Sequence, residues 1–161
     1  MRRNLLAIGF IFSTITDVCL FLVFPFLLAF GTYPLSIILR GVGWIKLGKE
    51  SKFKIFTVTG VGILILGFSF YIMMLSGITE SLLFIIMPWV IYSLMEFSSY
   101  IKVNKVFGVK LIGIAMIIFM SALPLFPRTP LEGEQLLQSF RYAFIPLLVS
   151  SIITAISFLR K

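Results

Sequence analysis

Three ionisable residues lie inside long apolar stretches of the chain and are its candidates for chemistry. They are Asp17, Arg40 and Glu96. Insertion of such a side chain at the centre of a membrane helix costs about 2.5–3.5 kcal/mol, so each is expected to face protein or water rather than lipid. Residues three, four and seven positions away from each of them are smaller or more polar than the rest of the stretch, as close helix packing in lipid requires.

Arg40 and Glu96 have opposite charges and the same expected depth. Each precedes a lysine by six residues, Lys46 or Lys102, which places it about 9 Å from that end of a helix. We therefore predict a buried ion pair between Arg40 and Glu96. In the alternative interpretation, Arg40 extends to the aqueous surface and Glu96 is neutral or bonded to a hydroxyl group.

Asp17 is expected to lie deeper and has three interpretations. With Ser13, Thr14 and Thr16 nearby, it suits an intramembrane carboxylate that binds a proton or cation. It equally suits a protonated carboxyl that donates a hydrogen bond to another helix, or the acidic partner of a basic residue on another subunit. A single carboxylate favours structure or assembly over transport.

The composition is that of a membrane protein. Of 161 residues, 60% are hydrophobic and 12% are charged, and the mean hydropathy is +1.11. Soluble domains are roughly 45–50% apolar and about 25% charged. The net charge of +8 lies in short turns and at the two ends, which indicates contact with a lipid bilayer and not with nucleic acid.

Histidine is absent and Cys19 is the only cysteine. These absences remove the common zinc sites, histidine-ligated haem, and catalysis by Ser-His-Asp or Cys-His. We therefore predict no catalytic residues, no metal and no cofactor, and we expect no enzyme activity.

Apolar stretches separated by turns predict an all-α integral membrane protein: one transmembrane domain over 1–161, without a soluble domain. Residues 31–34 supply a predicted break, and the first stretch is too long for a cleaved signal. The expected helices are 5–30, 34–49, 55–75, 82–101, 111–126 and 142–159. The second spans only about 24 Å, so the bundle has six spans, or five if 34–49 lies at the membrane interface.

Two lysine-rich turns, 46–54 and 102–110, orient this bundle. The positive-inside bias places both in the cytoplasm, with the turns 77–80 and 127–141 outside. With six spans, both termini are then cytoplasmic and the protein is a multi-pass protein of the cell membrane. Residues 56 positions apart match around the basic turns, Trp44 with Tyr100 and Lys54 with Lys110 among them. This spacing indicates an internal repeat of a helix hairpin, or convergence of two inward-running helices.

These features favour a small non-catalytic protein that serves as an accessory or structural subunit of a larger membrane complex, such as a respiratory or secretion complex. Its expected partners are lipid and other membrane subunits, or further copies of itself. The alternative is a small secondary transporter or ion-coupled carrier that uses Asp17 or Glu96 as its titrating group.

Overall fold

The computed structural model describes residues 3–22, 26–76, 82–122 and 134–160, and these residues contain six α-helices and no strand. Long runs of leucine, isoleucine, valine and phenylalanine supply the apolar residues of every helix. The helices are α1 (Arg3–Leu22), α2 (Phe26–Ser51), α3 (Lys54–Ser76), α4 (Leu82–Phe107), α5 (Lys110–Ala122) and α6 (Glu134–Leu159).

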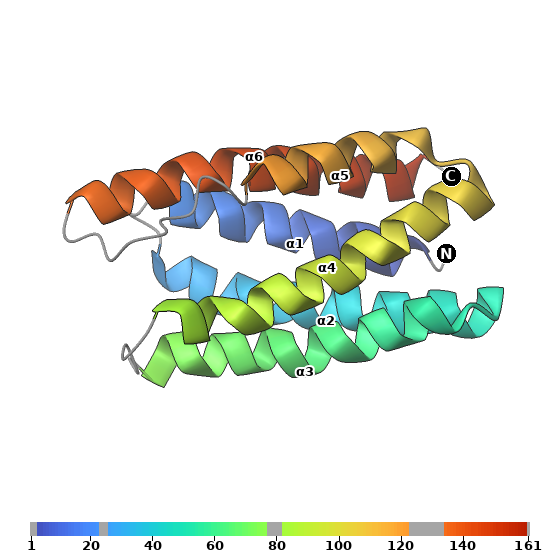
Figure 1. Cartoon of the computed structure of the whole chain (residues 1–161), viewed down its shortest axis with the longest axis horizontal. Helices are drawn as coiled ribbons and strands as arrows, with labels where there is room; N and C mark the ends of the chain where they lie inside the picture. The colour runs from blue at the N-terminus through green and yellow to red at the C-terminus, as the bar shows by residue number, and fades with distance from the viewer. Residues whose placement is uncertain (1–2, 23–25, 77–81, 123–133, 161) are drawn as a thin grey trace.

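The six helices form a ring in chain order (Figure 1). Each helix packs against the next, and α6 closes the ring by packing against α1. The start of α1, the α2–α3 turn, the α4–α5 turn and the end of α6 all lie at one end of the bundle. The interior of the ring is therefore built from one stripe of each helix.

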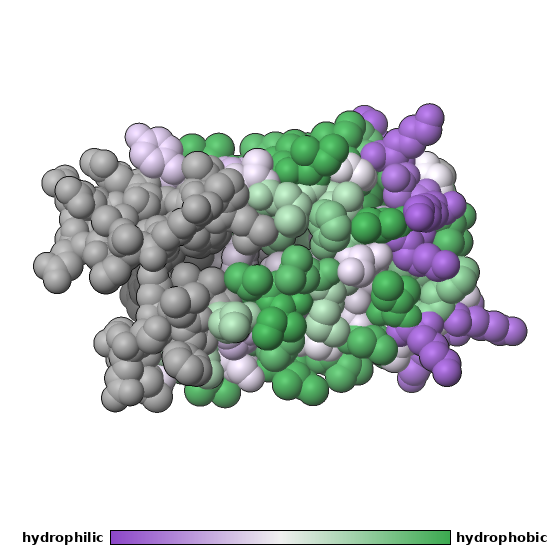
Figure 2. All heavy atoms as spheres, in the orientation of Figure 1, coloured by the Kyte–Doolittle hydropathy of each residue, from purple (hydrophilic) through white to green (hydrophobic). Residues whose placement is uncertain are grey.

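The bundle has a mainly apolar core, and its outer surface is apolar too, unlike that of a water-soluble bundle. Outward stripes are apolar, as on α1, where Ile8, Ile11, Ile15 and Val18 are each at least 36% exposed. Buried positions also include many polar side chains: Thr16, Asp17, Ser36, Arg40, Thr59, Ser93, Glu96, Ser99, Ser150, Thr154 and Ser157. Figure 2 shows the apolar band across the visible face and the hydrophilic residues gathered at one end.

One helical segment, Lys54–Met73, is by itself long and apolar enough to cross a membrane. Shorter apolar helices in the described residues are Asn4–Cys19, Lys110–Ala122 and Ile145–Leu159. Single helices of this kind also occur in soluble proteins, so length and composition alone do not establish six spans.

The predicted break at residues 31–34 is wrong, because α2 continues through it. Pro34 has no N–H to donate to the carbonyl of Phe30 one turn earlier. Tyr71 on α3 supplies the missing donor, its hydroxyl lying 2.9 Å from the Phe30 oxygen. A neighbouring helix thus satisfies the carbonyl that the proline leaves open, as occurs in membrane helices. Residues 34–49 are the later part of a 26-residue helix packed between α1 and α3, not a short separate helix.

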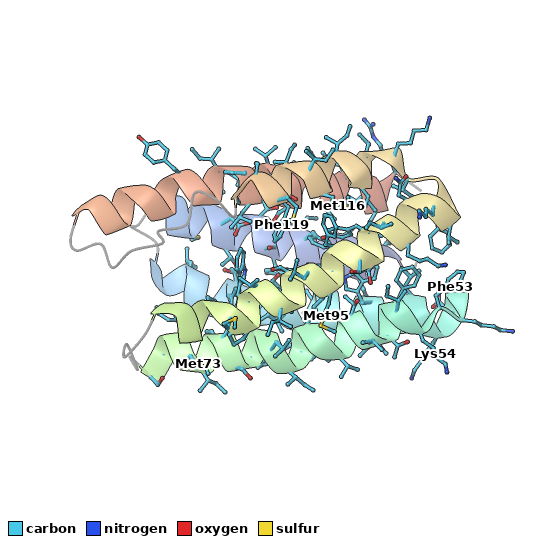
Figure 3. All side chains as sticks on the ribbon, viewed as in Figure 1. Phe53, Lys54, Met73, Met95, Met116 and Phe119 are labelled. Carbon is cyan, nitrogen blue, oxygen red and sulfur yellow. The ribbon has the colours of Figure 1, made fainter. Side chains whose placement is uncertain are left out.

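The basic turns are shorter than predicted, since most of their lysines lie on helix ends. The chain reverses around Lys52 (φ 60°) and Gly108 (φ 64°), both in the left-handed region. Figure 3 shows Phe53 and Lys54 at the first of these turns. The Lys102 ammonium lies 4.4 Å from the centre of the Phe53 ring, which links α4 to the α2–α3 turn.

The last predicted helix also starts too late. The sequence predicted a polar connection up to residue 141, but α6 begins at Glu134. The first residues of α6, EQLLQ, are good helix formers. Three of them are polar, as in a loop, so the sequence did not indicate the start of the helix. The predicted outer turn 77–80 and residues 123–133 lie outside the described residues.

The predicted hairpin repeat has a counterpart in the helix bounds. Adding 56 to the bounds of α2 (26 and 51) gives those of α4 (82 and 107), and adding 56 to residue 54 gives 110, the start of α5. The two left-handed turn residues, 52 and 108, are also 56 apart. The helix bounds and the turn residue therefore recur at the same spacing in α2–α3 and in α4–α5.

Candidate functional site

Arg40 and Glu96 meet inside the ring. Their helices, α2 and α4, flank α3, so the contact is made across the interior of the bundle. The Arg40 Nε donates a hydrogen bond to Glu96 Oε1 over 3.2 Å, and Arg40 Nη2 donates a second one to Oε2. Arg40 is 7% exposed and Glu96 is 3% exposed, so both charged side chains are buried inside the bundle.

Trp44 completes the coordination of the carboxylate. It lies one helical turn after Arg40, and its indole N–H donates to Glu96 Oε1 over 2.9 Å. One carboxylate therefore accepts three hydrogen bonds from two residues of α2. A bidentate guanidinium–carboxylate contact of this kind is among the stronger polar interactions in proteins, and it fixes the relative position of the two helices.

Aromatic rings enclose the guanidinium. The Arg40 Cζ lies 4.8 Å from the centre of the Phe10 ring and 5.9 Å from that of Tyr92, within the range of cation–π attraction. Gly9 on α1 makes this enclosure possible. A Cβ atom added to Gly9 would lie 2.8 Å from the Arg40 backbone nitrogen, so only glycine lets the two helices approach this closely.

The polar interior extends from Tyr92 to a second tyrosine. The hydroxyl groups of Tyr33 and Tyr92 are 3.1 Å apart and share a hydrogen bond. The described part of the bundle also contains one buried side-chain oxygen without a hydrogen-bond partner, the hydroxyl of Ser36, one turn before Arg40.

Asp17 lies in a separate polar group between α1 and α6. Its Oδ2 lies 3.0 Å from the Ser151 hydroxyl, which is also 3.5 Å from that of Ser13. The expected neighbours Thr14 and Thr16 bond elsewhere: Thr14 to the Phe10 carbonyl, and Thr16 to Thr32 and its own helix. Arg40 lies within electrostatic range of Asp17, but its hydrogen bonds go to Glu96.

Three partners were not predicted for these sites: the Trp44 donor, the Phe10 ring and the Ser151 hydroxyl. Trp44 had a usable signal, because it follows Arg40 by one turn on the same face. Phe10 and Ser151 are distant in sequence from Arg40 and Asp17, and only the closure of the ring brings them near.

The chemistry available in the interior is that of fixed charges and hydroxyl groups. The described residues contain no group of three or more histidine, cysteine, aspartate or glutamate side chains that could hold a metal ion. A comparison with known proteins finds no family model, no curated protein and no solved structure that matches this chain.

Proposed function

We propose that the chain is a multi-pass membrane protein of six spans with a non-catalytic, structural role in a larger membrane assembly. The apolar outer surface of the bundle is the first support. Soluble monomers rarely expose contiguous apolar patches above a few hundred Å². Here aliphatic stripes run along the outside of the helices, while several hydroxyl-bearing side chains and the charged pair Arg40 and Glu96 are buried.

The three longest helices are long enough for this placement. A helix of 26 residues, the length of α2, α4 and α6, is about 39 Å long, which exceeds a hydrocarbon core of roughly 30 Å. The lysines at the shared end of the bundle would then lie in the cytoplasm, together with both termini.

The observation that carries the structural role is the mutual satisfaction of the interior charges. Glu96 is held by Arg40 and Trp44, and Arg40 is enclosed by two aromatic rings. A transported ion or substrate would have to compete with these contacts. A rigid scaffold that presents its outer surface to neighbouring membrane subunits needs no such exchange.

Purification from the native membrane in a mild detergent tests this role. The proposal predicts that the chain resists carbonate extraction and co-purifies with other membrane proteins in fixed stoichiometry. Recovery as a lone monomer or homodimer would contradict the subunit role. Release by carbonate would contradict the membrane placement.

One observation favours the second candidate, an ion-coupled carrier. Asp17 is a buried carboxylate whose hydrogen bond comes from a hydroxyl group, so it remains open to a proton or a cation. Glu96, the other titrating group proposed for a carrier, is engaged by Arg40. Proton or sodium flux into proteoliposomes that disappears in Asp17→Asn but persists in Ser13→Ala would support transport.

A further inference from the structure

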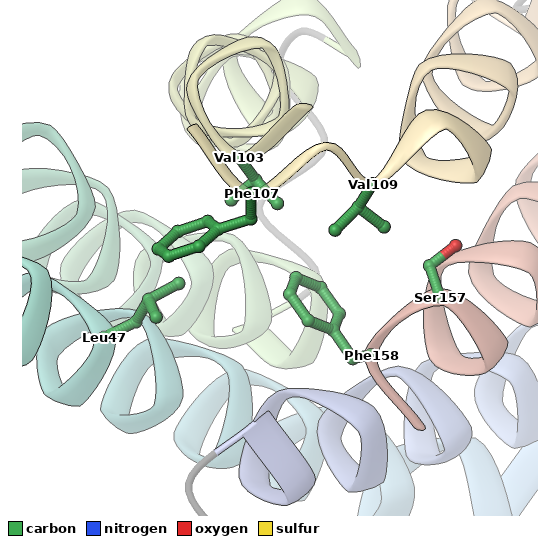
Figure 4. Close-up of a pocket in the computed structure, with 6 residues that line it drawn as sticks. All are labelled: Leu47, Val103, Phe107, Val109, Ser157 and Phe158. Carbon is green, nitrogen blue, oxygen red and sulfur yellow. The ribbon is translucent and has the colours of Figure 1, made fainter. Parts of the chain in front are cut away.

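An open space lies at the basic end of the bundle, between the α4–α5 turn and the end of α6. Its outer part is a cavity of about 280 Å³ lined by Gly108, Val109, Lys110, Leu111, Ser157 and Arg160. A crevice too narrow to admit a water molecule adjoins it and shares Val109 and Ser157 (Figure 4). The crevice reaches the buried side chains of Val103 and Phe158.

The two hairpins of the repeat differ in how closely their helices pack. In α2–α3, glycines allow close approach: a Cβ atom on Gly60 would lie 2.5 Å from the Gly41 carbonyl oxygen. The equivalent residues of α4–α5, 56 positions later, are Met116 and Phe97. The packing of α4 against α5 is less extensive than that of α2 against α3, and α5 packs more extensively against α6. Figure 1 shows α4 running obliquely away from α5 beyond their shared turn.

Charge and polarity divide this space into two parts. Lys110 and Arg160 are exposed at the outer cavity, and no acidic side chain is among the residues that line it. Lys110 is also the first residue of α5, where the helix dipole adds partial positive charge. The walls of the inner crevice are apolar apart from Ser157, whose hydroxyl donates to the Ile153 carbonyl of its own helix.

We propose that this space binds one anionic phospholipid. The lipid phosphate lies in the outer cavity, between Lys110 and Arg160, and the acyl chains remain in the bilayer. A cavity of 280 Å³ is slightly smaller than the usual 300–1,000 Å³ of small-molecule sites, so it suits a headgroup whose chains remain in the bilayer. This inference rests on the proposed membrane placement.

Lipid binding can be measured on the full chain in an uncharged detergent. Native mass spectrometry during titration with a short-chain phosphatidylglycerol, and separately with phosphatidylcholine, gives the number of bound lipids and their affinity. The proposal predicts one tightly bound phosphatidylglycerol and weaker binding of phosphatidylcholine. Removing both charges, in Lys110→Gln with Arg160→Gln, is expected to weaken phosphatidylglycerol binding about 25-fold, since each cation near a membrane surface changes affinity about fivefold.

A matched control removes two charges from the other hairpin. Lys54 occupies the position equivalent to Lys110, so Lys54→Gln with Lys46→Gln is expected to retain the wild-type affinity. Equal losses in both double variants would show a diffuse surface effect and overturn the site. Because all four side chains are exposed, thermal unfolding of both variants should match the wild type.

Further measurements distinguish a lipid phosphate from a free anion, and the lipid site from the membrane placement on which it rests. Ser157→Leu fills part of the outer cavity without changing charge and should weaken lipid binding. If inorganic phosphate displaces the lipid at equal concentration, the site is one for a free anion and the lipid proposal is wrong. If the chain resists carbonate extraction but binds both lipids equally, the lipid site alone fails. If carbonate releases the chain, the membrane placement fails as well.

Discussion

Removing one partner of the Arg40–Glu96 pair should destabilise the bundle strongly. In Arg40→Leu, Glu96 loses two of its three hydrogen bonds and keeps only the Trp44 donor. In Glu96→Leu, the guanidinium keeps only the rings of Phe10 and Tyr92. Leaving a buried charge without its counter-ion costs about 3–5 kcal/mol, so each single variant is expected to lose this much unfolding free energy.

The double variant Arg40→Leu with Glu96→Leu removes both charges and leaves neither unpaired. It is expected to be less destabilised than the sum of the single variants by about 2–3 kcal/mol, the upper range for residues in direct contact. Equilibrium unfolding in mixed detergent–SDS micelles, followed by circular dichroism, gives the three free energies. Lys105→Leu serves as the control, because it removes an exposed cation from the helix that carries Glu96.

Two results would refute this reasoning. Single variants within about 0.5 kcal/mol of the wild type, the range of ordinary surface substitutions, would show that the pair does not hold α2 and α4. A double variant equal to the sum of the single variants would show that the two side chains are not coupled in the folded protein.

Two further predictions follow from the packing of α2 against α1 and against α3. Gly9→Ala should cost about 1–3 kcal/mol of unfolding free energy because its Cβ atom must push α1 away from α2. Gly31→Ala is the control, since no atom lies within 4 Å of a Cβ atom at that position. Equal unfolding midpoints for the two variants would contradict the close contact. Tyr71→Phe should cost about 0.5–1.5 kcal/mol by removing the hydroxyl that donates to the Phe30 carbonyl. The same change should cost less in a Pro34→Ala background, where the helix supplies its own N–H, and an undiminished cost there would count against this explanation.

The sequence predicted the helical content and the spacing of the hairpins, because both depend on local patterns. Apolar runs define the helices, and lysines mark the ends that share one side. The matched positions of Arg40 and Glu96, six residues before a lysine, predicted the contact that the structure contains. The spacing of each residue from its lysine is enough to predict that the two side chains lie at the same depth in the bundle.

The remaining features depend on tertiary contacts. The helix passes through Pro34 because Tyr71, 37 residues later, satisfies the open carbonyl, and no local rule contains that donor. Likewise, the partner of Asp17 is Ser151, 134 residues away, which becomes a neighbour only when α6 closes the ring on α1. The early start of α6 was missed because a polar helical turn and a polar loop have similar composition.

The membrane placement is tested most directly by labelling a single cysteine at the basic end of each hairpin. In a Cys19→Ala background, single cysteines at Lys49 and Lys105 report the compartment that each end faces, since both positions are exposed at the same end of the bundle. In sealed vesicles of known orientation, an impermeant maleimide is expected to label both cysteines from the cytoplasmic face and neither from the opposite face. Labelling of the two positions from opposite faces would contradict the proposed topology and the shared depth of Arg40 and Glu96.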